Sequence, residues 1–249
     1  EKVFQSFQLC LPSSKESKKY LEKFKVKNIK YFGNLKLASE NKIGILPEKN
    51  DEILNINKFW CALSTHREEE IFCLKTHLKI KSVHKNVITI IIPRHINRVA
   101  DIKKSCQKFN LDYQILSNDE LIKNGKEIII INSYGETSKY LRPCKSVFIG
   151  KSMIERLKLV GGQNPIEAAK LNCKIYHGPY VYNFEEIYNL LNDYNISEKI
   201  NDESELSNKI IRDLNQSNET NIEKIQTINS LGKKILNDTL NELDQIINK

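Results

Sequence analysis

Short apolar runs alternate along most of the chain with segments in which apolar and polar residues recur at helical spacing. The runs predict buried strands at 59–63, 87–92, 112–116, 127–131, 146–149 and 174–176. The segments between them predict helices at 67–81, 96–109, 118–124, 135–141, 164–171 and 183–193. Such alternation indicates an α/β fold with a Rossmann-like parallel sheet and helices on both of its faces.

The first part of the chain has a more polar pattern. Ser13 or Ser14 can cap a helix that runs to about Lys25, and a short strand at 29–32 is expected to follow. The polar stretch from there to about residue 57 is typical of a loop or an ordered linker. The chain starts with Glu rather than Met, so we expect it to be a piece of a longer protein.

The last part of the chain, from Asp202, predicts two helices joined by a polar turn at 212–222. The expected organisation is therefore an entry segment with its helix at 1–36, a Rossmann-like domain at 37–201 and C-terminal helices at 202–249.

Composition narrows the class of protein. The chain has 249 residues and 40% hydrophobic content, which suits one large or two small domains. A membrane-spanning helix needs roughly 20 consecutive apolar residues, and the runs here are far shorter. Isolated cysteines and the lack of paired histidines predict a reducing compartment and no metal site. The cysteines are Cys10, Cys61, Cys73, Cys106, Cys144 and Cys173.

The net charge of +8 indicates an anionic partner, which could be a nucleotide phosphate, an acidic lipid or a nucleic acid. Seven lysines fall between Lys15 and Lys30. Because Tyr20 and Phe24 are spaced for one face of the same helix, we interpret the lysines as its solvated face. No aromatic or Arg-rich pattern of a nucleic-acid-binding protein accompanies them.

Three polar segments follow predicted strands or open a predicted helix. They are Pro93-Arg94-His95, Ser133-Tyr134-Gly135-Glu136 and Gly161-Gly162-Gln163-Asn164-Pro165-Ile166-Glu167. In open α/β sheets, ligands bind at the carboxyl ends of the strands. The sequence therefore predicts that these segments meet at one edge of the sheet and form a site there.

The segment from Asn164 to Glu167 has two interpretations. Asn suits the N-cap, Pro the first helical position and Glu the third, so the segment can be simply a helix start. Gly161 and Gly162, however, let a ligand approach the backbone, and free helix N–H groups can bind an anion. The Glu167 carboxylate could also accept hydrogen bonds from a ribose diol.

The other candidate site residues also have both a functional and a structural interpretation. Arg94 can bind a phosphate or carboxylate in bidentate fashion, or it can be a surface ion-pair partner. Glu136 can face a ligand or be an ordinary first-turn acid. After a further strand, Thr65 can be a helix N-cap and His66 a structural histidine.

In this order, the segments resemble those of the bacterial Kdo transferases, which move 3-deoxy-D-manno-octulosonic acid (Kdo) from CMP-Kdo onto lipid A precursors. The resemblance implies a GT-B fold of two Rossmann-like domains, with this chain as the C-terminal, donor-binding one and the N-terminal acceptor domain absent. It extends over nearly the whole chain, through Phe4-Gln5-Ser6-Phe7, Gly33-Asn34-Leu35-Lys36, Ser64-Thr65-His66 with Glu69 and Glu70, the three segments above, Gly178-Pro179 and Asn183-Phe184.

The resemblance also implies roles for residues. It places no catalytic residue in this chain, because the family's catalytic base is a glutamate of the N-terminal domain. It implies CMP-Kdo as donor substrate, without a metal or other cofactor. The implied CMP-binding residues are Pro93, Arg94, Tyr134, Gly135, Glu136, Asn164, Pro165, Ile166 and Glu167. Contacts with the donor sugar or the cleft are expected from Ser64, Thr65, His66, Gly162 and Gln163.

Some positions depart from the family pattern. Tyr134 stands where Met is common, and Glu68 stands where Gly is usual. Lys151 occupies the position at which a second glycine often follows Gly150. The loop at 153–160 is longer than in many relatives.

The function expected from the resemblance is Kdo transfer to a lipid A precursor, lipid IVA, in lipopolysaccharide core biosynthesis. The full-length protein would lie on the cytoplasmic face of the bacterial inner membrane through peripheral contacts, whereas this fragment would be soluble.

One alternative is a GT-B donor domain for a UDP- or GDP-sugar. A second is a non-catalytic basic module for acidic lipid or nucleic acid, which the placement of motifs at strand ends disfavours; nucleic acid is not an expected partner.

Overall fold

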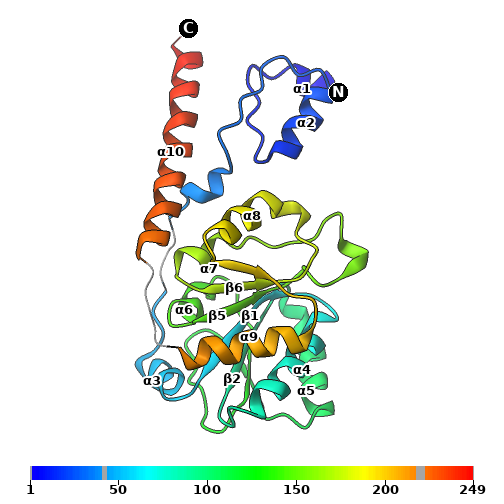
Figure 1. Cartoon of the computed structure of the whole chain (residues 1–249), viewed down its shortest axis with the longest axis vertical. Coiled ribbons are helices and arrows are strands. Elements are labelled where there is room, and N and C mark those ends of the chain that lie inside the picture. The colour runs from blue at the N-terminus through cyan, green and yellow to red at the C-terminus, as the bar shows by residue number, and fades with distance from the viewer. Residues whose placement is uncertain (1, 41–43, 217–221, 249) are drawn as a thin grey trace. The chain divides into compact units, whose positions relative to one another are not determined.

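The computed structural model describes residues 2–40, 44–216 and 222–248, and the chain divides into two compact units (Figure 1). The larger unit comprises Asn41–Asn221. The smaller unit joins the two ends of the chain, Glu1–Glu40 and Ile222–Lys249.

The larger unit contains a parallel sheet, which has seven strands within the described residues, in the order β3-β4-β2-β1-β5-β6-β7. The predicted α/β class with a Rossmann-like parallel sheet is confirmed. The strands are β1 (Phe59–Thr65), β2 (Ile88–Pro93), β3 (Tyr113–Leu116), β4 (Ile128–Ile131), β5 (Ser146–Ile149), β6 (Lys174–His177) and β7 (Ser197–Lys199).

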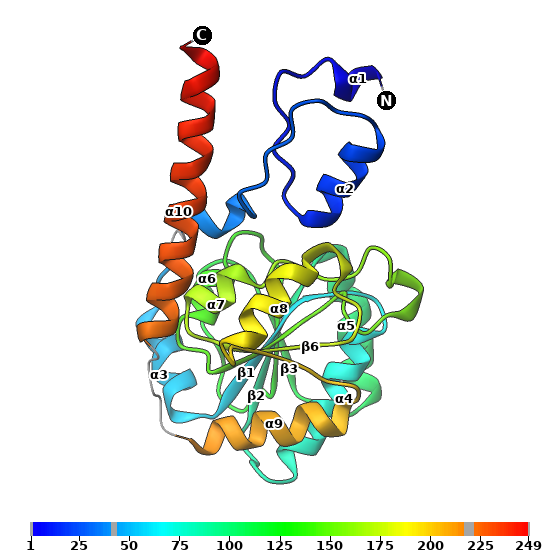
Figure 2. The ribbon, with the colours of Figure 1, turned by 45° about the horizontal axis from the view of Figure 1, so that its top comes forward.

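Helices cover both faces of this sheet, as Figures 1 and 2 show. One face carries α4 (Glu69–Lys81), α5 (Val99–Lys108) and α9 (Glu203–Asn215), and the other carries α6 (Thr137–Leu141), α7 (Ile166–Lys170) and α8 (Glu185–Asp193). Because side chains alternate along a strand and both faces are covered, strand residues of either orientation are buried. The unit also contains α3 (Glu48–Ile56) and the short 3₁₀ turns η2 (Ile96–Arg98), η3 (Glu155–Leu157) and η4 (Tyr182–Phe184).

The smaller unit consists of α1 (Lys2–Gln5), α2 (Lys15–Lys23), η1 (Leu35–Ala38) and the long α10 (Ile222–Ile247). Ser14 caps α2 as expected, since its side chain accepts a hydrogen bond from the Ser17 N–H at 3.0 Å. η1 packs against α10 at Gly232, where an added Cβ would lie 2.1 Å from the carbonyl oxygen of Leu37. A glycine therefore permits the two ends of the chain to approach closely.

The helix expected at 118–124 does not form, whereas α3 lies in a stretch expected to be a loop. Asn50 of α3 explains the first difference. Its amide donates to the Glu120 carbonyl at 2.9 Å, and its side-chain oxygen accepts from the Ile122 N–H at 2.7 Å. A distant side chain thus occupies backbone groups that a helix would have paired internally.

The strand expected at 29–32 is also absent from the described residues, where only an isolated bridge pairs Cys10 with Ile29. Conversely, β7 was not expected because its sequence, Ser-Glu-Lys, is polar. Glu198 of β7 forms ion pairs with Lys174 at 2.6 Å and Lys209 at 2.7 Å. These ion pairs lower the pKa of Glu198 to about 2, against the opposing effect of burial.

The unit boundaries differ from the predicted division at residue 201, because α9 packs on the sheet and on α4 rather than joining α10. The expected turn at 212–222 falls partly in α9, and its residues 217–221 lie outside the described part. Asp213 joins α9 to the sheet. Its carboxylate accepts hydrogen bonds from the Ser146 hydroxyl at 2.8 Å and the Tyr176 hydroxyl at 2.5 Å.

Asp213→Ala should lower the free energy of unfolding by about 2–4 kcal/mol, because two buried hydroxyl groups would lose their acceptor. Urea denaturation followed by circular dichroism measures this change. Asn208→Ala, at an exposed position of the same helix, is the matched control and should change stability by less than about 0.5 kcal/mol. Equal stability of the two variants would contradict the proposed anchoring role of Asp213.

Candidate functional site

The carboxyl ends of three adjacent strands form the centre of the candidate site. β1 lies between β2 and β5. The Arg94 N–H donates to the Thr65 carbonyl at 3.0 Å, and the Gly150 N–H donates to the Leu63 carbonyl at 2.8 Å. The chain proceeds from β1 to one side of the sheet and from β5 to the other, so this is the topological switch point at which open α/β sheets bind ligands.

A buried carboxylate fixes the turns that follow β1 and β5. Glu69, only 1% exposed, accepts four backbone N–H groups at 2.7–3.0 Å. Burial raises the pKa of Glu69, and the four hydrogen bonds oppose that shift because they stabilise the ionised form. The donors are His66 on the β1 side and Lys151, Ser152 and Met153 on the β5 side.

The same turns have unusual backbone conformations. An added Cβ at Gly150 would lie 2.6 Å from the Ser64 carbonyl oxygen, so only glycine fits there. Ser64, Glu68 and Lys151 have φ values of 53°, 83° and 57°. Glu68 and Lys151, at which the resemblance led us to expect glycine, therefore occupy the left-handed conformation that glycine adopts without steric cost.

Some buried polar atoms at the end of β1 and in the segment after β4 have no partner among the described residues. The Thr65 and Ser133 hydroxyls and one oxygen of Glu136 have no hydrogen-bond partner among the described residues. Buried polar groups are normally paired, so these atoms suit contact with a bound polar molecule. Thr65 is not the N-cap of α4, because it lies within β1 and Glu68 occupies the N-cap position.

Arg94 is exposed, and its guanidinium has no ion-pair partner in the described part of the chain. The interpretation of Arg94 as a surface ion-pair partner therefore has no support. The rings of His66 and His95 meet edge to face at 5.9 Å. Burial lowers the pKa of His66, and the nearby positive charges of Lys151, His95 and Arg94 add to that effect.

The segment after β4 presents an open backbone. Tyr134 is 66% exposed, and an added Cβ at Gly135 would meet nothing within 4 Å. One carboxylate oxygen of Glu136 has no partner among the described residues. Its second oxygen forms an ion pair with Lys139 at 2.8 Å, and Lys139 also forms an ion pair with Asp119 at 2.8 Å. Glu136 is thus already neutralised on one side by a cation.

The segment from Asn164 to Glu167 caps α7 through one side chain only, and not through the expected capping box. The Asn164 side-chain oxygen accepts from the Ile166 N–H at 3.1 Å. Glu167 does not complete a capping box, since its half-buried carboxylate has no hydrogen-bond or ion-pair partner among the described residues. Burial alone raises the pKa of Glu167. The carboxylate is thus available to a ligand.

Other predicted site residues are buried or half-buried. Pro93, Pro165 and Ile166 are buried. Gly162 has φ +86°, and an added Cβ would lie 2.9 Å from Val181. The Gln163 carbonyl accepts from the Tyr188 hydroxyl at 3.0 Å.

The helices that follow two of the predicted site segments are short. α6 and α7 contain only five residues each, and such short helices have small dipoles. The positive charge at this edge comes instead from side chains such as Arg94 and Lys151. Sequence reasoning did not select Glu69 or Lys151 as site residues, because nothing in the sequence shows that their loops meet.

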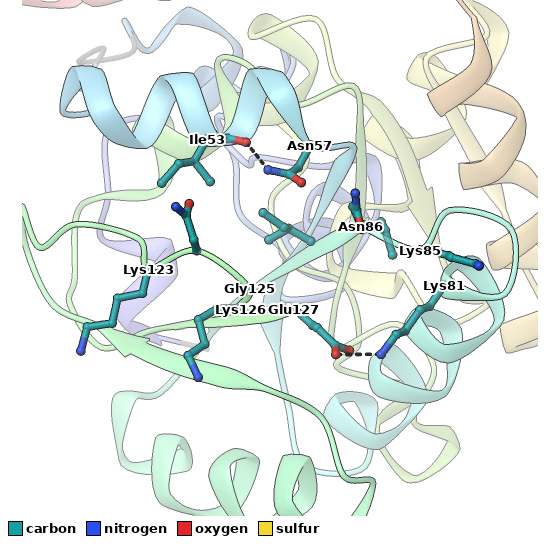
Figure 3. Close-up of a pocket in the computed structure, with 12 residues that line it drawn as sticks. Ile53, Asn57, Lys81, Lys85, Asn86, Lys123, Gly125, Lys126 and Glu127 are labelled. Carbon is teal, nitrogen blue, oxygen red and sulfur yellow. Dashed lines mark hydrogen bonds and ion pairs between the residues drawn. The ribbon is translucent and has the colours of Figure 1, made fainter.

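A separate hollow of about 500 Å³ opens at the opposite edge of the sheet (Figure 3). It lies at the amino ends of β2 and β4 and is lined largely by lysine and asparagine side chains. It contains none of the predicted site residues.

None of the helices among the described residues is both long and apolar enough to cross a bilayer. In the same part of the chain, no group of three or more His, Cys, Asp or Glu side chains is arranged to hold a metal ion.

Known proteins resemble this chain in sequence and in fold. No protein-family model matches it. It is 26% identical over 243 residues to the 3-deoxy-D-manno-octulosonic acid transferase of Rickettsia prowazekii, covering 93% of this chain and 51% of that protein. It is 30% identical over 135 residues to the enzyme of the same name from Haemophilus influenzae, covering 53% of this chain and 30% of that protein. The chain thus spans about half or less of these relatives.

A solved structure shares the fold. The crystal structure of the C-terminal CMP-Kdo binding domain of WaaA from Acinetobacter baumannii superposes with a TM-score of 0.60 at 22% identity, covering 76% of this chain and 96% of that one. The resemblance indicated by the motifs is confirmed by these curated relatives, and the Rossmann-like fold expected for this chain is confirmed by this structure.

Glu69→Gln should lower the free energy of unfolding by about 2–4 kcal/mol, because an amide has one acceptor oxygen for four N–H donors. Thermal and urea melts of the purified chain measure the loss. The exposed neighbour Glu68→Gln is the control, since it removes the same charge one residue away. If both variants melt alike, the four hydrogen bonds do not hold the two turns together.

Proposed function

We propose that this chain, a homologue of the Kdo transferases, binds the sugar nucleotide CMP-Kdo at the carboxyl edge of its sheet. One observation supports the proposal: the Arg94 guanidinium and the half-buried Glu167 carboxylate have no partner among the described residues, and buried polar atoms of Thr65, Ser133 and Glu136 in the strand-end segments also lack one. A nucleotide offers the complementary groups, a phosphate for the cation and ribose hydroxyls for the carboxylate.

In this proposal, each group has a defined role. Arg94 binds the phosphate and stabilises the charge that develops on the leaving CMP. Glu167 accepts hydrogen bonds from the ribose diol. Gly135 and Tyr134 leave the backbone after β4 open to the nucleotide, and Thr65 and His66 face the donor sugar. The charge on the phosphate is balanced by side chains, so the proposal includes no metal ion.

The activity of the whole protein is also a proposal, because the chain spans only part of its relatives. We infer that this donor-binding half works with an acceptor domain supplied by the rest of the protein. Kdo would pass from CMP-Kdo to a lipid A precursor such as lipid IVA, in lipopolysaccharide core biosynthesis. Such a lipid acceptor would place the full-length protein at the cytoplasmic face of the inner membrane.

The isolated chain should bind CMP in preference to UMP and GMP, and it should not transfer sugar by itself. Isothermal titration calorimetry with the three nucleotides measures the preference. Cytidine without phosphate serves as a control for the contribution of the phosphate. Equal affinity for all three nucleotides would contradict the CMP assignment, and a preference for UMP or GMP would favour a donor domain for a UDP- or GDP-sugar.

Arg94→Ala and Glu167→Gln should each weaken CMP binding by about 1.5–3 kcal/mol, the usual value of a hydrogen bond to a charged group. The Arg94 variant should lose affinity for CMP but not for cytidine, whereas the Glu167 variant should lose affinity for both. Arg142→Ala, at an exposed position outside the site, should leave binding unchanged.

Thermal melts must accompany these titrations, because Glu167 lies in the first turn of α7. If Glu167→Gln lowered the melting temperature and left CMP affinity unchanged, its role would be confined to the helix.

A further inference from the structure

Lys151 is the departure from the family pattern that directly follows a strand at the switch point of the sheet. It follows β5 directly, between Gly150, which admits no side chain, and Ser152, which is fully buried. Its half-buried side chain is therefore the only one that this three-residue turn can direct toward a ligand.

The backbone of Lys151 is held on both sides. Its N–H donates to the Glu69 carboxylate at 2.7 Å, and its carbonyl accepts from the Gly162 N–H at 2.7 Å. The residue thus joins the turn after β5 to the loop that leads to Asn164. A side chain that starts from so fixed a point has a restricted range of positions.

The conformation of Lys151 is costly for a lysine. Its φ of 57° lies in the left-handed region, where glycine is the residue without strain. Residues held in such conformations cluster at functional sites. The Lys151 ammonium also has no hydrogen-bond or ion-pair partner among the described residues.

The surroundings of Lys151 are cationic. The Lys151 and His66 N–H groups donate to the same oxygen of Glu69, and the Arg94 N–H donates to the carbonyl of Thr65, the residue before His66. The charges of Lys151 and Arg94 add to the effect of burial in lowering the pKa of His66. Unpaired cations that gather at a strand-end crevice repel each other unless an anion lies between them.

We propose that Lys151 is a donor-binding residue whose ammonium contacts an anionic group of the sugar nucleotide, in a position where a glycine would offer only its backbone. This inference rests on the proposed function. The anionic group can be the nucleotide phosphate or the carboxylate of the transferred sugar acid, and both present the same charged oxygens to a lysine.

The test compares Lys151→Gly with the wild-type chain by calorimetric titration of cytidine, CMP and CMP-Kdo. The variant should lose about tenfold in affinity for the ligand whose anionic group Lys151 contacts, and it should keep its affinity for cytidine. A loss already seen with CMP identifies the phosphate, and a loss seen only with CMP-Kdo identifies the sugar carboxylate. Unchanged affinity for both ligands would overturn the proposal.

Two control variants separate charge from strain. Lys158→Gln removes one positive charge from an exposed position in the following loop and should leave affinity unchanged. Glu68→Gly relieves a similar left-handed conformation and should raise the melting temperature without weakening binding. Lys151→Gly should raise the melting temperature and weaken binding together, a combination that a purely structural lysine would not give.

The same titrations distinguish this inference from the proposed function. If the wild-type chain binds no CMP, the proposed function fails, and the inference about Lys151 fails with it. If the wild-type chain binds CMP and Lys151→Gly binds both ligands equally well, only the inference about Lys151 fails.

Discussion

The buried carboxylate of Glu69 is the interaction on which the candidate site depends. A carboxylate removed from water is stable only when other donors replace its hydration, and here the donors are backbone N–H groups of two turns that are far apart in sequence. The position of each turn is therefore set by one charge. Because Arg94 is tied through its backbone to Thr65, the end of β2 is fixed by the same arrangement.

This arrangement also explains how left-handed residues persist around the site. Ser64, Glu68 and Lys151 all have positive φ values and all lie beside the Glu69 carboxylate or its donors. Strain of this kind survives where surrounding contacts leave the chain no alternative conformation. The hydrogen bonds of the Glu69 side chain thus offset the unfavourable backbone conformations of several neighbouring residues. The same residues lie at the candidate site, so the stability of these turns and their contact with a ligand depend on the same hydrogen bonds.

The sequence predicted the sheet well, because a parallel strand buried on both faces reads as an apolar run whatever its neighbours are. It failed where a distant side chain decides the local conformation. Asn50 binds the backbone at Glu120 and Ile122 and prevents a helix whose local pattern is adequate. Likewise, Glu69 looks like an ordinary first-turn acid, and its partner turn after Gly150 appears only in the folded chain.

The smaller unit has a consequence for the order in which the chain folds during synthesis. Residues 44–216 contain every strand of the described sheet, and they leave the ribosome before α10 exists. The segment around Leu37, by contrast, packs against Gly232 near the other end of the chain. The segment around Leu37 therefore finds its partner only after the residues of the sheet have been made, and until then it is exposed to proteases and chaperones.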